Sequence, residues 1–70
     1  MKLENGILYC TQQEYEWVRK CSILMASPYV AGFYLYHRLK NNNLLTLEWN
    51  QFVYRDVILA FRKKNVEIVD

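Results

Sequence analysis

The chain has 70 residues, which is enough for one domain with a small hydrophobic core. Hydrophobic residues make up 53% of the chain and aromatic residues 16%, with two glycines and one proline, and this composition excludes a disordered or linker-rich protein. Nine Lys and Arg against seven Asp and Glu give a net charge of +2, too small to indicate a dedicated nucleic-acid-binding protein or an attraction to anionic membranes.

The N-terminal segment predicts a short β-ribbon over residues 2–9. Asn5-Gly6 stands between two short segments that contain apolar residues, and this dipeptide favours a hairpin turn because both residues accept a positive φ. A single short strand is unstable by itself. We therefore expect the largely β-branched residues 66–69 to form a terminal strand that pairs with this ribbon.

A first helix is predicted over residues 12–26. Thr11 and Glu14 form a T-x-x-E capping box, in which each side chain accepts a hydrogen bond from a free backbone N–H at the helix start. On a helical wheel one face is apolar and the opposite face is charged, and Ile23 falls among the charged residues. The apolar face consists of Trp17, Val18, Cys21, Leu24 and Met25.

The two cysteines do not indicate a disulfide framework. Cys10 is expected near the end of a strand and Cys21 three turns into the first helix, roughly 15 Å apart by helical rise, which is too far for a bridge. We interpret them as reduced thiols of a cytoplasmic protein, with Cys21 in the core.

The stretch SPYVAGFYLYHRLK predicts a second helix over residues 28–40, because Ser27 is a good cap and Pro28 is tolerated at the first helical position. No charged side chain precedes Arg38, so most of this helix is apolar all round. Two arrangements stay open. The helix is either buried between the other two, with tyrosine hydroxyls such as that of Tyr34 at its edges, or one side stays exposed until a partner covers it.

A third helix is predicted over residues 47–63, opened by Thr46. Phe52 and Leu59 fall on the arc opposite its apolar face, among charged residues that should be solvated. Tyr54 is expected at the margin of the apolar face. That face consists of Trp49, Val53, Val57, Ala60 and Phe61.

Together these elements predict a mainly α fold, a compact three-helix domain over residues 1–70 with a short β-ribbon from the N- and C-terminal segments, that is, a small α+β protein. The longest apolar run, residues 23–36, is shorter than the roughly 18 residues that span a bilayer and is interrupted by Ser27 and Pro28. We therefore expect no membrane-spanning helix.

The misplaced apolar residues predict a contact with another protein, because interfaces are enriched in aromatic residues and arginine. For Phe52 and Leu59 the alternatives are packing against the terminal ribbon and simple exposure. The predicted partner-binding residues are Phe52, Leu59, Arg55, Arg62, Tyr34 and Ile23.

The basic residues allow a second hypothesis, a small nucleic-acid-binding protein. Arg55, Arg62, Lys63 and Lys64 would contact phosphates, and tyrosines would stack on bases. The simpler interpretation is that positive charge compensates the helix dipoles at the carboxyl ends of the second and third helices.

No pattern indicates catalysis or metal binding. His37 is the single histidine, and with Cys10 and Cys21 it has none of the recurrent metal-ligand spacings. We expect no catalytic residue, metal, cofactor or small-molecule substrate. The predicted function is a non-enzymatic interaction protein, an adaptor, inhibitor or regulator of the kind that phages and mobile elements encode, whose partner is another protein or a second copy in a homodimer.

Overall fold

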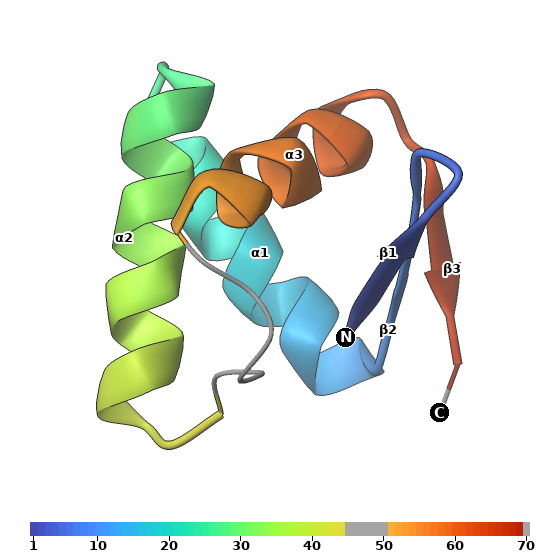
Figure 1. Ribbon diagram of the computed structural model, residues 1–70, viewed down its shortest axis with the longest axis horizontal. Coiled ribbons are helices and arrows are strands. Elements are labelled where there is room, and N and C mark those ends of the chain that lie inside the picture. The colour runs from blue at the N-terminus through green and yellow to red at the C-terminus, as the bar shows by residue number, and fades with distance from the viewer. Residues whose placement is uncertain (45–50, 70) are drawn as a thin grey trace.

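The computed structural model describes residues 1–44 and 51–69, with the backbone only for Gln51. Within this part of the chain it contains three helices and one three-stranded sheet, so the predicted small α+β fold is confirmed (Figure 1). In chain order the elements are β1 (Lys2–Glu4), β2 (Ile7–Cys10), α1 (Gln12–Leu24), α2 (Pro28–Asn41), α3 (Gln51–Arg62) and β3 (Val66–Ile68).

The sheet joins the two ends of the chain in the strand order β1-β2-β3. The pairing of the N-terminal ribbon with a C-terminal strand is therefore as predicted. β1 and β2 are antiparallel, with Leu3 opposite Leu8, and the connecting Asn5 and Gly6 have φ values of 54° and 76°. β3 runs parallel to β2, with Val66 opposite Leu8. β2 is therefore the central strand, and β1 and β3 are the edges.

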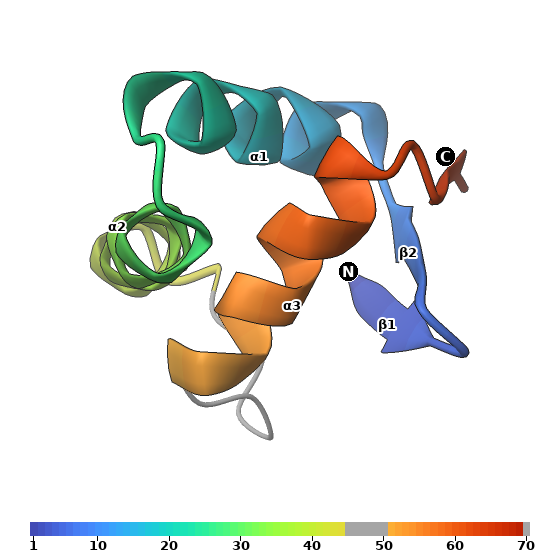
Figure 2. The same cartoon turned by 90° about the horizontal axis from the view of Figure 1, so that it is seen from above.

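α3 lies between α2 and the sheet, and α1 crosses over them (Figure 2). This arrangement gives α3 neighbours on several sides, and its buried side chains form the middle of the core. The sheet contributes Leu8 and Cys10 from its inner face and α1 contributes Val18 and Cys21. The other core residues are Ala31, Leu35 and Leu39 from α2 and Tyr54, Val57, Ile58 and Ala60 from α3, and every core residue is at most 4% exposed.

The starts of α1 and α2 follow their local signals. Thr11 and Glu14 form both hydrogen bonds of the predicted capping box, at 3.1 and 2.9 Å. Ser27 is the N-cap of α2 and Pro28 occupies its first turn, although the Ser27 side chain accepts no cap hydrogen bond. Cys10 and Cys21 are buried as thiols, as expected.

α1 is shorter than predicted. It ends at Leu24 instead of residue 26, and the predicted core residue Leu24 is 61% exposed. Met25 has an extended backbone that turns the chain towards α2. The buried face of α1 is therefore narrow and centred on Val18 and Cys21, and Leu24 lies beyond its edge.

The buried face of α3 is also rotated relative to the prediction. Tyr54, expected at the margin, is 1% exposed, and Ile58, absent from the predicted face, is fully buried, whereas Val53 and Phe61 are only half-buried. α2 packs directly against the Tyr54 side of α3, and this packing turns that side inward. The predicted start of this helix at 47, its cap Thr46 and the inward position of Trp49 lie outside the described residues.

Candidate functional site

The seam between α2 and α3 is unusually close at Gly32. A Cβ atom at this position would lie 2.5 Å from the backbone N of Arg55 and 2.8 Å from its Cα. Where α2 and α3 cross, their backbones are therefore in direct contact with no side chain between them. This close approach brings the residues that flank Gly32 next to the first turn of α3. Phe33 and Tyr29 of α2 thus lie beside Phe52 and Arg55 of α3, and together these four residues line a hollow of about 190 Å³.

Large apolar side chains on this side of the molecule are exposed. The exposed fraction is 61% for Tyr29, 49% for Val30, 52% for Phe33 and 62% for Phe52. Phe33 also contacts His37 one turn further on, with ring centroids 4.3 Å apart. We call the surface formed by Tyr29, Val30, Phe33, Phe52 and Arg55 the aromatic face. Of the two arrangements left open for the second helix, the structure has the one in which one side is exposed.

Arg55 lies at the edge of the aromatic face and hydrogen-bonds two neighbouring side chains. Its Nη1 donates a hydrogen bond of 2.8 Å to the hydroxyl of Tyr29, and its guanidinium carbon lies 4.9 Å from the centre of the Tyr29 ring. Nε and Nη2 donate to one carboxylate oxygen of Asp56 at 3.2 and 3.0 Å. Hydrogen bonding to Asp56, and then to Tyr29, raises the pKa of Arg55, whose guanidinium is positively charged in proteins in any case.

The predicted partner-binding residues do not form one site. Phe52 and Arg55 belong to the aromatic face. Leu59 is half-buried and lines a separate hollow with Leu3 and Gly6 of the hairpin, which fits the alternative of packing against the ribbon.

The other two apolar or aromatic candidates also lie elsewhere. Tyr34 is on the α1 side of α2, where Arg38 stacks on it and on Trp17, each ring centre 5.5 Å from the guanidinium carbon. Ile23 is 68% exposed on α1, as expected. Tyr29, Val30 and Phe33 were not predicted as site residues, although the uncharged start of their helix was a signal for an exposed apolar side.

Arg62, predicted at the contact surface, binds the end of α1 instead. Its guanidinium donates hydrogen bonds to the carbonyl oxygens of Ser22, Met25 and Ala26 at 3.1, 2.6 and 2.7 Å, and to the hydroxyl of Ser22 at 3.0 Å. Helix ends leave backbone carbonyls without partners, and a cation there also complements the helix dipole. Arg62 therefore acts as a cap supplied to α1 by α3.

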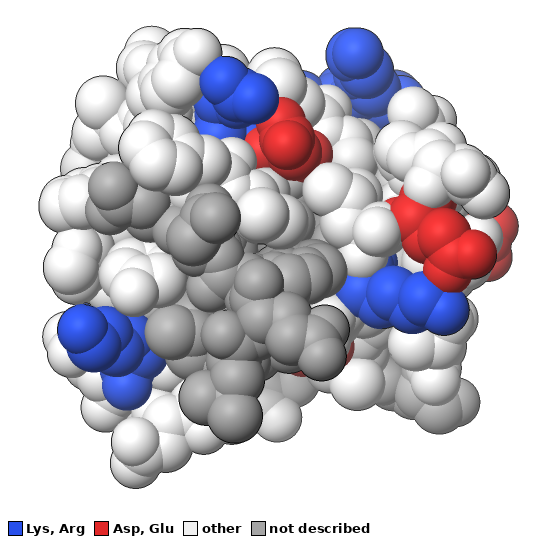
Figure 3. All heavy atoms as spheres, in the orientation of Figure 1, with Lys and Arg blue, Asp and Glu red and all other residues white. Residues whose placement is uncertain are grey.

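The four basic residues of the nucleic-acid hypothesis do not share one role. Arg55 and Arg62 are engaged with protein acceptors, and Lys63 and Lys64 are exposed. On the face drawn in Figure 3 the basic side chains lie in separate groups, with acidic atoms beside some of them. On this face the basic side chains therefore form no continuous track for a phosphate backbone.

The described residues, 1–44 and 51–69, bring no three His, Cys, Asp or Glu side chains together in a way that could hold a metal ion. The imidazole of His37 contacts two aromatic rings, and its centroid lies 4.3 Å from that of Phe33 and 5.3 Å from that of Tyr36. Within the same part of the chain, no helix has the length and apolar character needed to cross a bilayer. Burial raises the pKa of the Cys21 thiol, which is the opposite of what an activated nucleophile needs.

Comparison with known proteins gives no match. No family model fits the chain, and no curated protein and no solved structure is significantly similar to it.

Proposed function

We propose that the protein is a small non-enzymatic interaction module that binds another protein molecule through the aromatic face. The observation that carries the proposal is the cluster of Tyr29, Phe33 and Phe52, three large side chains that are each more than half exposed and line one hollow between α2 and α3. Contiguous apolar surface of this kind is uncommon on a protein that works alone, because water covers it at a cost in free energy.

The composition of the face fits a protein partner better than a small ligand. Its hollow of about 190 Å³ is smaller than the roughly 300 to 1,000 Å³ of typical small-molecule pockets. Aromatic anchors with an arginine at the rim are the residues that contribute most to protein interfaces. Arg55 already hydrogen-bonds Tyr29 and Asp56, which reduces the side-chain entropy that it loses when a partner binds.

The proposal includes two details that the sequence suggested. The partner is either a different protein, for which this chain is an adaptor, inhibitor or regulator, or a second copy in a two-fold homodimer, which would place the same face of each copy together. The two buried thiols support a reducing compartment such as the cytoplasm.

The test begins with the molar mass in solution across a range of concentrations, at low and at high salt, for the wild type and two variants of the face, Phe52→Asp and Phe33→Asp. Both side chains are more than half exposed, so the variants should remain folded, as circular dichroism would check. Ile23→Asp is the matched control, because Ile23 is 68% exposed but lies outside the face. A dimer that persists in salt, is lost in both face variants and is kept in the control supports the proposal with a second copy as partner.

A monomer at every concentration directs the test to a different protein. The partner is then captured from cells that express the tagged chain and identified, and binding of the purified pair is measured. The proposal requires that Phe52→Asp and Phe33→Asp abolish this binding and that Ile23→Asp does not. Equal binding by all variants contradicts it, and binding that falls steeply with salt indicates phosphate contacts instead.

A further inference from the structure

A second surface lies on the side of α3 that faces away from α2, where β3 forms one edge of the sheet (Figure 1). Backbone hydrogen bonds join Asn65 O and Val69 N to β2, at 2.8 and 2.9 Å. In a strand, successive residues point their backbone N–H and C=O groups to opposite edges. The N–H and C=O of Val66 and Ile68 therefore point away from β2, towards the open edge.

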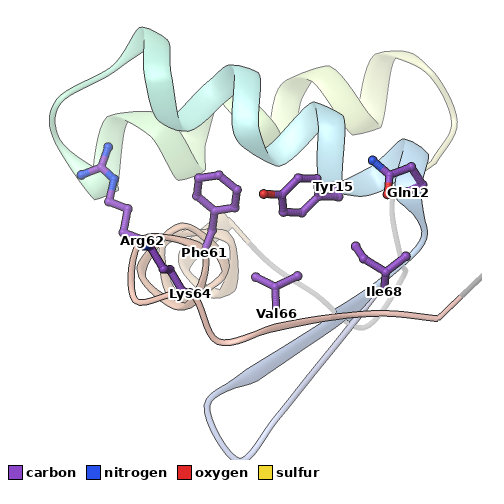
Figure 4. Close-up of a pocket in the computed structure, with 7 residues that line it drawn as sticks. All are labelled: Gln12, Tyr15, Phe61, Arg62, Lys64, Val66 and Ile68. Atoms are coloured by element: carbon purple, nitrogen blue, oxygen red, sulfur yellow. The ribbon is translucent and has the colours of Figure 1, made fainter.

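An apolar groove of about 530 Å³ runs between this edge and α1 (Figure 4). The side chains of Val66 and Ile68 point from β3 into it, because the register places them on the same face of the sheet as the core residues Leu8 and Cys10. Tyr15 and Phe61 form the opposite wall, with ring centroids 5.4 Å apart. Ile68 is nevertheless 44% exposed, so the helices cover this part of the sheet incompletely.

The rim of the groove is polar and basic. Gln12 lies at the end near Ile68, and Arg62 and Lys64 lie at the other end (Figure 4). No acidic residue of the described chain lines the groove. Because the Arg62 guanidinium is occupied with α1, the exposed ammonium of Lys64 is the charge that a bound carboxylate would meet.

We propose that this edge and groove bind an extended segment of another protein, which adds a fourth strand beside β3. Its backbone would pair with the outward groups of Val66 and Ile68, alternate apolar side chains would enter the groove, and an acidic residue would contact Lys64. Strand addition of this kind takes affinity from backbone hydrogen bonds and specificity from the pockets for alternate side chains. This inference is independent of the aromatic face.

The backbone of Lys64 supports a role for its side chain. Its φ is +63°, a left-handed conformation that closes the end of α3 and that glycine adopts more easily. Among the described residues with positive φ, the others are Asn5, Gly6 and Asn43, which are residue types that tolerate this region. Lysine thus stands at the groove rim where glycine would be the more stable choice.

A second copy of this chain is a poorer occupant than a different protein. Two β3 strands paired antiparallel about their centre would place the Glu67 side chains of the two copies directly opposite each other, and like charges in opposed positions are destabilising. A partner segment with apolar residues at alternate positions and its carboxylate near the start of β3 avoids this repulsion.

The test uses a short synthetic peptide of alternating valine and threonine, capped at both ends, with one glutamate at each end. It is titrated into the isotope-labelled protein while backbone amide signals are followed by NMR. We expect shifts in β3 and in the groove, and slower hydrogen exchange of the Val66 and Ile68 amides on binding. One control peptide carries lysine in place of glutamate, and another is N-methylated at alternate residues so that it cannot form strand hydrogen bonds. Both should bind more weakly.

Three variants separate binding from folding. Ile68→Thr keeps a β-branched strand residue but removes apolar surface from the groove, and should weaken peptide binding about tenfold. Val69→Thr is its control, because successive side chains of a strand alternate and that of Val69 points to the face of the sheet opposite the groove. This variant should leave peptide binding unchanged. Lys64→Gly should weaken binding about threefold while raising the melting temperature, a combination that a merely destabilised variant cannot give.

Several outcomes would overturn the proposal. Unchanged exchange of the Val66 and Ile68 amides at saturating peptide, or shifts confined to β1 or the aromatic face, places binding elsewhere. Equally tight binding of the N-methylated peptide means that the groove takes apolar groups without strand pairing. Protection of these two amides that grows with protein concentration alone means that a second copy occupies the edge.

Discussion

Replacing Gly32 by alanine tests the close approach of α2 and α3 on which the aromatic face depends. In an isolated helix this change stabilises by about 1 kcal/mol, because glycine loses more backbone freedom on folding. Here the new Cβ would lie 2.5 Å from the backbone N of Arg55 and 2.8 Å from the carbonyl carbon of Tyr54. Backbone atoms cannot rotate aside as a side chain can, so the two helices must move apart.

The steric cost should exceed the gain in helix propensity. Overpacking of a well-packed core costs typically about 1 to 3 kcal/mol, and a contact with backbone on both sides belongs at the upper end of that range. Subtracting the gain of about 1 kcal/mol leaves a net loss of about 2 kcal/mol in the free energy of unfolding. With a urea dependence of about 1 kcal/mol per molar for a chain of this size, the unfolding midpoint should fall by about 2 M.

The assay is urea unfolding followed by circular dichroism, with Lys20→Ala and Lys20→Gly as the matched control pair. Lys20 is exposed in α1, so this pair measures the difference between alanine and glycine without a steric contribution, and alanine should be the more stable by about 1 kcal/mol. If Gly32→Ala were stabilised by a similar amount, α2 and α3 could not approach each other backbone to backbone at this position, and the geometry of the aromatic face would be wrong.

Two further substitutions test contacts elsewhere in the fold. Arg62→Ala should lower the free energy of unfolding by about 1 to 2 kcal/mol, less than for a fully buried set of hydrogen bonds because Arg62 is exposed to solvent. In the same urea assay the control Lys63→Ala should change the free energy of unfolding by less than about 0.5 kcal/mol. Equal effects of the two variants would show that Arg62 does not cap α1. For Glu14, burial raises the pKa of the carboxyl, but hydrogen bonds from the N-terminal ammonium and from Thr11 outweigh it and hold the pKa below the ordinary value of 4.5. Because the carboxyl group has a lower pKa in the folded protein than in the unfolded chain, it stabilises the fold at pH values above its ordinary pKa, and this contribution is lost as the pH falls through the folded-state pKa. The difference in the free energy of unfolding between wild type and Glu14→Gln should therefore be largest near neutral pH and vanish in acid. A difference that stayed constant with pH would contradict this assignment.

Features that depend on neighbours in the chain could be predicted from the sequence. The capping box of Thr11 and Glu14 joins residues three positions apart, and the hairpin turn at Asn5-Gly6 needs only two adjacent residues that accept a positive φ. Pro28 starts α2 for an equally local reason. The order of elements and the pairing of the terminal strands followed from such signals together with the need of a short strand for a partner.

Features that depend on how helices pack could not be predicted in this way. A helical wheel shows which residues share a face of a helix but not which face the neighbouring helices cover, and α2 packs at Gly32 against the backbone of Tyr54 and Arg55. Arg62 looked like a solvated charge because its acceptors lie 36 to 40 residues earlier in the chain.

The sequence by itself therefore determined the fold class and the starts of the first two helices, and it showed that the second helix carries almost no charge along its length. Only the tertiary structure decided where exposed apolar surface lies, because the aromatic face combines residues from two helices, such as Tyr29 and Arg55, which are 26 positions apart. The same is true of the groove beside β3, which exists because the sheet extends beyond the helices that cover it. Local hydrogen bonding fixes the elements, whereas the shape of the surface between them depends on close packing of side chains distant in the sequence.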